Sequence, residues 1–116
     1  MRHRKKKITL DRGSAHRRSL LRNLATSLIL YDHIKTTEAK AKAVRPLVER
    51  LVSLSKNPTL ANRRKMGRVL YTKGALRKAC EVLGPRYKDR KGGYVRITHV
   101  GTRRGDAARE AHISFV

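Results

Sequence analysis

The sequence has little of what disulfide-rich, zinc-binding and membrane proteins depend on. It contains one cysteine, no tryptophan, one phenylalanine and four tyrosines. A lone cysteine, Cys80, forms neither an internal disulfide nor a cysteine-based zinc site, and it suits a reducing compartment. The longest apolar run, residues 28–31, is far shorter than the roughly 20 residues of a membrane helix, and no apolar signal segment follows the basic start. We therefore expect a cytosolic protein without a membrane partner.

Acidic side chains are also scarce. Eight Asp and Glu stand against 30 Lys and Arg, which gives a formal net charge of +22 on 116 residues. No two acids have a spacing that places them on one predicted face, as paired acid–base catalysis requires. The five histidines are isolated or lie in basic surroundings, and Gly92–Gly93 lacks the context of a phosphate-binding loop. We expect no catalysis, no metal or cofactor site and no small-molecule substrate.

The abundant feature is positive charge, which favours a polyanionic partner. Hydrophobic residues make up 39% of the chain, enough for one small core. With so few aromatic side chains for stacking on bases, phosphate contacts to folded RNA fit best. Two alternatives stay open: a DNA-architectural module that uses residues 59–71 as its exposed helix, and an RNA-modifying enzyme. The first has few base-reading Asn and Gln side chains, and the second lacks a recognisable site.

The charge is densest at the N-terminus. Residues 1–13 form a basic stretch in which Asp11 is the only acid and no apolar residue follows Met1 before Ile8. Like charges repel one another, so we predict an extended basic N-terminal arm that becomes ordered only on RNA. Residues 14–116 are predicted to form a single globular RNA-binding domain.

Apolar periodicity predicts two strong helices after the arm. Ser14 is the predicted N-cap of the first, which ends near Tyr31 with that tyrosine on its apolar face. The second follows a capping Thr37, and its apolar stripe continues in register across Pro46. Pro46 therefore predicts a bend rather than a break.

Two further helices are predicted in the middle of the chain. Residues 59–71 have poor apolar periodicity and predict a peripheral helix. Residues 72–83 form a clearer pattern, with Gly84–Pro85 as the predicted stop. Cys80 lies on the apolar stripe of this helix, which predicts a buried, inert thiol.

Three segments have the composition of strands. Asp32–Thr37 predicts a short strand, Tyr94–Val100 alternates with Tyr94 on the polar side, and Ala111–Phe115 alternates again. The last two predict a hairpin, which needs a third strand to be stable. The predicted fold is α+β, with about four helices packed on a small three-stranded mixed β-sheet.

Short motifs along the chain resemble one known family, the bacterial large-subunit ribosomal protein L17. The motifs follow one another in the family's order and cover essentially the whole chain: Met1-Arg2-His3-Arg4, His16-Arg17, Arg22-Asn23, Ile34-Lys35-Thr36-Thr37, Lys40-Ala41-Lys42, Ala61-Asn62-Arg63-Arg64, Leu83-Gly84-Pro85-Arg86, Gly93-Tyr94, Arg96-Ile97 and Gly105-Asp106-Ala107. The chain departs from the family at Arg109–Glu110, where the family more often has Pro-Met, so the start of the last strand is in question.

The resemblance implies a structural constituent of the large ribosomal subunit, without catalysis, in the cytoplasm. It implies binding to the large-subunit (23S) ribosomal RNA near the polypeptide exit tunnel, beside neighbouring large-subunit proteins. Together with the charge, it defines a predicted RNA-binding set: Arg2, His3, Arg4, Lys5, Lys6, Lys7, Arg12, His16, Arg17, Arg18, Arg22, Lys35, Lys40, Lys42, Arg45, Arg63, Arg64, Arg86, Arg90, Lys91, Arg96, Arg103 and Arg104.

Overall fold

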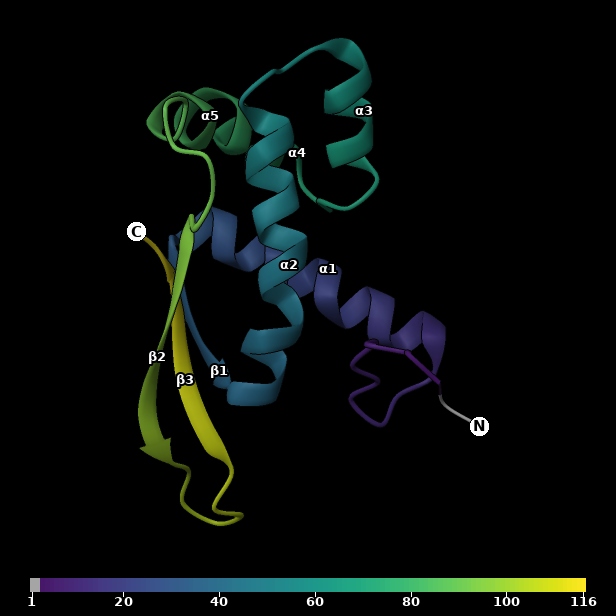
Figure 1. Ribbon diagram of the computed structural model, residues 1–116, viewed down its shortest axis with the longest axis vertical. Coiled ribbons are helices and arrows are strands. Elements are labelled where there is room, and N and C mark those ends of the chain that lie inside the picture. Colours follow the sequence, from purple (N-terminus) through teal and green to yellow (C-terminus); the bar gives the residue numbers. More distant parts are fainter. Residues whose placement is uncertain (1–2) are drawn as a thin grey trace.

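The computed structural model describes residues 3–116, which fold into helices and a small antiparallel sheet joined by irregular segments (Figure 1). The elements are, in order, α1 Ser14–Tyr31, β1 His33–Thr37, α2 Glu38–Ser55, α3 Leu60–Gly67, α4 Lys73–Lys78, the π-helical turn η1 Ala79–Leu83, α5 Gly84–Arg86, β2 Val95–Thr102 and β3 Arg109–Phe115. The predicted α+β class is confirmed. Arg2, a member of the predicted RNA-binding set, lies outside the described residues.

The three strands pair in the order β1-β3-β2, and both pairings are antiparallel. The prediction of a mixed sheet is therefore wrong. A short connection between β2 and β3 allows only an antiparallel pair, and β1 runs opposite to β3 on the other edge. Ile34, Ile113 and Ile97 stand opposite one another across the sheet. β3 begins at Arg109, so the unusual Arg109–Glu110 pair does not prevent the last strand from starting there.

Helix α2 covers one face of the sheet and contacts all three strands. Val44, Val48 and Leu51 are buried along it, in the predicted stripe. The helix is continuous from Glu38 to Ser55 with Pro46 inside, which confirms that the proline does not break it. Pro46 lies on the exposed side, away from the packed stripe.

Helix α1 differs from its prediction at both ends. Gly13 occupies the N-cap position and Ser14 is the first helical residue, so the predicted serine cap is wrong. Tyr31 is 67% exposed instead of packed. The buried face passes through Ala25, Leu28 and Ile29, and this places the last residue of the helix outside the core.

The middle helices begin where a threonine caps them. The Oγ1 atom of Thr59 accepts a hydrogen bond from the N–H of Asn62 at 3.3 Å, and that of Thr72 accepts from Ala75 at 3.1 Å. α3 ends at Gly67, shorter than predicted. Beyond α4, the chain stays helical through η1 and α5 to Arg86, so Gly84 is not the predicted stop.

Tyr94 was predicted on the polar side of its strand but is 2% exposed. It precedes β2, and its ring lies 5.2 Å from the ring of Tyr87. Its hydroxyl accepts a hydrogen bond from Lys56 Nζ at 3.0 Å and donates one to the Arg90 carbonyl at 3.0 Å. Its polar group is therefore satisfied inside the fold, which allows the ring to join the core.

Candidate nucleic-acid interface

The N-terminal segment turns back on the fold. Residues 3–13 contain no helix or strand, and Figure 1 shows them looping beneath the start of α1. Arg12 N–H bonds to the Thr9 carbonyl at 3.1 Å, and residues 5–11 line a hollow together with Ala39 of α2. The predicted extended arm is thus not confirmed. His3, Arg4, Lys5, Lys6 and Lys7 of the predicted set nevertheless have exposed side chains along it.

Arg17 holds the root of this segment against α1. Its side chain is only 9% exposed, and its guanidinium donates to the Arg12 carbonyl and to Ser14 Oγ, both at 3.3 Å. Arg12 in turn donates to the Leu10 carbonyl at 2.9 Å. Two members of the predicted RNA-binding set therefore bond to the chain itself. Their donors satisfy carbonyls in a turn where regular structure provides no partner.

Helices α1 and α2 carry six other members of the set. His16, Arg18 and Arg45 are exposed, and Arg22 and Lys40 are half-buried. Lys42 is exposed but lies 2.6 Å from Glu38, one helical turn earlier. These helices thus present cations that are rigidly positioned, in contrast to those of the irregular N-terminal segment.

The sheet and its hairpin contribute four members. Lys35 on β1 pairs with Glu110 on β3 at 3.0 Å, while Arg96 on β2 is exposed. Arg103 forms a two-pronged ion pair with Asp106 at the exposed hairpin tip, and Arg104 beside it is exposed. The hydrogen bond from Arg103, helped by that from the Ala108 N–H, lowers the pKa of Asp106 from 3.8 to about 2.

The remaining members lie at the opposite end of the fold from the hairpin tip. Arg63 and Arg64 are exposed on α3, and Arg86 lies over the ring of Tyr87 at 5.9 Å. Arg90 donates to the Gly92 carbonyl at 3.2 Å, and Lys91 is exposed. The described members of the set thus surround the molecule rather than lining one cleft.

Sequence reasoning missed cations that the fold brings beside the set. Arg63 on α3 lines a hollow of about 330 Å³ together with Lys73 and Arg77 of α4 and Glu81 of η1. Lys73 and Arg77 are one helical turn apart, so their spacing could have indicated a shared face. Cys80 also borders this hollow; it is half-buried, and burial raises the pKa of its thiol.

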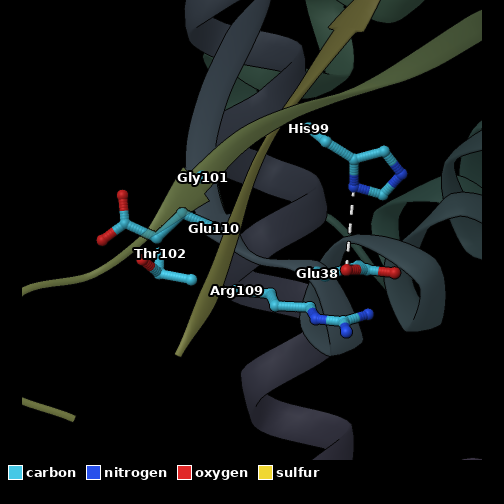
Figure 2. A pocket seen from close by; sticks show the side chains of 6 residues that line it. All are labelled: Glu38, His99, Gly101, Thr102, Arg109 and Glu110. Atoms are coloured by element: carbon cyan, nitrogen blue, oxygen red, sulfur yellow. Dashed lines mark ion pairs between the residues drawn. The ribbon is translucent and has the colours of Figure 1, made fainter. Parts of the chain in front are cut away.

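Glu38 is the centre of the one ion-pair cluster that joins α2 to the hairpin among the described residues. Its carboxylate lies 2.6 Å from Lys42 Nζ and 3.7 Å from His99 Nδ1. Figure 2 shows His99 and Arg109 directed toward Glu38, at a hollow of about 350 Å³, whereas Glu110 points to the other side of the strands. The hydrogen bond from Lys42 is the main cause that lowers the pKa of Glu38. A lowered pKa makes this carboxylate a weaker proton acceptor, so it is poorly suited to act as a general base.

Two other kinds of site are absent from residues 3–116. Residues 3–116 hold no group of three or more His, Cys, Asp or Glu that could bind a metal ion. No helix within the same residues is long and apolar enough to span a membrane. The chemistry that the described surface offers is therefore mainly that of Lys and Arg donors.

Comparison with known proteins gives one consistent result. Three similar relatives, each named large ribosomal subunit protein bL17, align with all of this chain. The protein of Solibacter usitatus is 49% identical over 116 residues, 77% of its own length. That of Acidobacterium capsulatum is 45% identical over 72% of its length, and that of Sphingopyxis alaskensis is 50% identical over 84%. A family model described as ribosomal protein L17 matches residues 20–116, and the chain therefore belongs to the ribosomal protein L17 family.

Proposed function

We propose that this chain is a structural, non-catalytic component of the large ribosomal subunit, and that it binds the large-subunit ribosomal RNA mainly through phosphate contacts. Membership of the ribosomal protein L17 family supports the structural role and the place in the ribosome, in the bacterial cytoplasm. The RNA contacts are inferred from the charges of the surface. Bonds to phosphate oxygens fix the position of a protein on nucleic acid without needing aromatic platforms.

The observation that carries the proposal is how little of the positive charge is neutralised internally. The chain has 30 Lys and Arg but only 8 Asp and Glu to neutralise them, and four of these acids already pair with Lys35, Lys42, Lys78 and Arg103. Such an excess of positive charge destabilises a compact state through self-repulsion. RNA phosphates in contact with these side chains would relieve this self-repulsion. They would also accept charge-assisted hydrogen bonds from the Lys and Arg donors.

The N-terminal segment and the globular part have separate roles in this proposal. Residues 14–116 supply the rigid domain, whose exposed members of the predicted set, such as Arg18, Arg64 and Arg96, make fixed phosphate contacts. Residues 1–13 are the arm, and its described part, residues 3–13, leaves its folded-back position when the arm follows RNA grooves. The root of the arm stays tied to α1 through Arg17, so only the residues before Arg12 are free to rearrange.

Two finer parts of the proposal come from the resemblance to the family. They are a location close to the polypeptide exit tunnel and contacts with neighbouring large-subunit proteins. Tyr31, the last residue of α1, and Tyr71, in the connection between α3 and α4, are exposed by 67% and 52% and are side chains suited to a protein neighbour.

The test is a competition between large-subunit RNA and duplex DNA of equal length at moderate salt. We expect at least tenfold tighter binding to the RNA, because specific sites exceed non-specific phosphate attraction by much more than that. A scrambled RNA of the same length serves as the control for charge alone. Equal affinity for RNA and DNA would contradict the ribosomal RNA proposal and favour a DNA-architectural module.

A further inference from the structure

The face of the sheet turned away from α2 carries no helix among the described residues. Val95, Ala111 and Ile113 are buried on the face that packs against α2. Because side chains alternate along a strand, the residues between them point the other way. On that side His33, Lys35, Arg96 and Thr98 are exposed, and His112 and Ser114 are half-buried. We name these six residues the open sheet face.

Strand register arranges the open sheet face in two rows. One row is His33, Ser114 and Arg96, and the next is Lys35, His112 and Thr98. Neighbours within a row are about 4.8 Å apart, and the rows are about 6.8 Å apart. Two cations, two imidazoles and two hydroxyls therefore lie within a patch about 10 Å wide. Each of the six can donate a hydrogen bond, and the hydroxyls can also accept one.

The polar surface continues beyond these rows toward the hairpin tip. The third row places Thr37 and Gly101 on either side of Glu110, whose carboxylate is bonded to Lys35. Next to it, Lys35, Lys40 and Arg103 line a hollow of about 340 Å³ together with Thr37 and Glu110. Cations thus extend from Arg96 at one end to Arg103 at the other.

We propose that the open sheet face docks on the sugar–phosphate backbone of RNA, with His33 and His112 among its binding residues. This inference rests on the proposed function and adds where on the fold one contact surface lies. The face has no Phe, Tyr or Trp ring to serve as a stacking platform for bases, and none of its six residues is apolar, which disfavours the core of a protein interface. Its positive charge complements phosphate.

The hydroxyls and imidazoles give the face a means to distinguish RNA. The ribose 2′-hydroxyl both donates and accepts hydrogen bonds, and so do Thr98, Ser114 and neutral histidine. Arg96 matches phosphate, since its planar guanidinium can bridge two oxygens, and within residues 3–116 it is paired with no acid. A sheet surface that combines cations, hydroxyls and imidazoles suits the sugar–phosphate backbone of RNA better than the edges of bases in a groove.

Chemical modification of the histidines tests the inference on the unaltered chain. Diethyl pyrocarbonate is applied to the free protein and to its complex with large-subunit RNA containing no other protein, and each histidine is read by mass spectrometry. We expect at least threefold slower modification of His33 and His112 in the complex. His99, whose side chain is 66% exposed and lies on the α2 side of the sheet, is the internal reference and should change less.

The outcomes separate this inference from the proposed function. If the RNA binds but His33 and His112 react as in the free chain, the open sheet face is not a docking surface. Equal protection of all three histidines would also overturn it, because a general screening effect would suffice. Protection found only in whole subunits would assign the face to a protein neighbour. Failure to bind the RNA at all would instead remove the proposed function, and this inference with it.

A charge reversal gives a second, independent measurement. Arg96→Glu should weaken RNA binding roughly tenfold or more, since an attractive charge-assisted contact becomes repulsive, and it should reduce the salt slope by about one. Lys88→Glu is the matched control, because Lys88 is also exposed but belongs to a turn outside the face. Equal losses from the two substitutions would contradict a role for the face beyond net charge.

Discussion

Gly84→Ala should change the stability of the protein through a close backbone contact that only the fold reveals. A Cβ atom added at Gly84 would lie 2.4 Å from the carbonyl oxygen of Ser55 and 3.0 Å from its carbonyl carbon. Both atoms are backbone, so no side chain can rotate away. Since an ordinary contact begins near 3.4 Å, α5 would have to move by about 1 Å from α2, against the packing of Leu83 and Val52 in the core.

Overpacking of this kind costs about 3 kcal/mol at the upper end. Replacing a helical glycine by alanine returns about 1 kcal/mol of helix propensity, so we expect a net loss of about 2 kcal/mol in the free energy of unfolding. Gly74→Ala is the matched control, because its Cβ would meet only Leu30 Cδ2 at 3.9 Å. It lies in the first turn of α4 and should gain about 0.5 kcal/mol.

Urea unfolding followed by circular dichroism measures both variants. About 0.15 M salt limits the Debye length to about 8 Å and so weakens self-repulsion of the charge. With a urea slope of about 2 kcal/mol/M, the two midpoints should differ by more than 1 M, with Gly84→Ala the lower. If Gly84→Ala is as stable as Gly74→Ala, the close approach of α5 to α2 does not constrain this position.

Three other predictions concern charged groups. Deleting residues 1–7 should reduce the slope of log binding constant against log salt concentration by about 4, because five Lys and Arg are removed. Arg17→Ala should cost about 1–2 kcal/mol and speed amide exchange before Arg12, since its buried donors are lost; exposed Arg18→Ala should stay within about 0.5 kcal/mol. The lowered pKa of Asp106 means that its contribution to stability is complete above about pH 4 and is lost as the pH falls through about 2. The stability difference between the wild type and Asp106→Asn should therefore shrink over that range.

Each of these has an outcome that would contradict it. An unchanged salt slope after the deletion would remove the arm from the interface. Equal effects of Arg17→Ala and Arg18→Ala on stability and exchange would mean that the guanidinium of Arg17 does not hold the arm. A stability difference at Asp106 that is constant between pH 5 and pH 2 would show that its pKa is not lowered by folding.

The elements that sequence reasoning predicted well are those whose pattern repeats. α1 and α2 have apolar side chains at helical spacing over 18 residues each, and the alternation of Val95 with Ile97 identified β2. Burial of one face stabilises such segments in almost any arrangement. The net charge likewise needed no fold, and it predicted a polyanionic partner from composition alone.

Predictions failed where a single residue's role depends on a distant neighbour. Tyr94 looked exposed by alternation, but Lys56 and the Arg90 carbonyl satisfy its hydroxyl and admit it to the core. Gly84 looked like a helix stop, because glycine usually is one, yet it serves as the contact point with Ser55. The hydrogen bond from the Arg17 guanidinium to the Arg12 carbonyl was not foreseen either, while the contact of Arg17 with RNA stays a prediction. Lys56 and Ser55 are far in sequence from the residues they contact, whereas the Arg90 and Arg12 carbonyls lie only four and five residues from theirs.

The amino-acid sequence by itself determined the charge, the positions of the main helices and strands, and the resemblance to a ribosomal family. These depend on composition and local periodicity, which are properties of the chain before it folds. Only the tertiary structure decided which cations are bonded internally and which remain on the surface. It also decided that His33, His112 and Arg96, scattered in sequence, share one face, because the order β1-β3-β2 sets which strands are neighbours. Strand order is fixed by packing across the whole fold, and no local pattern contains it.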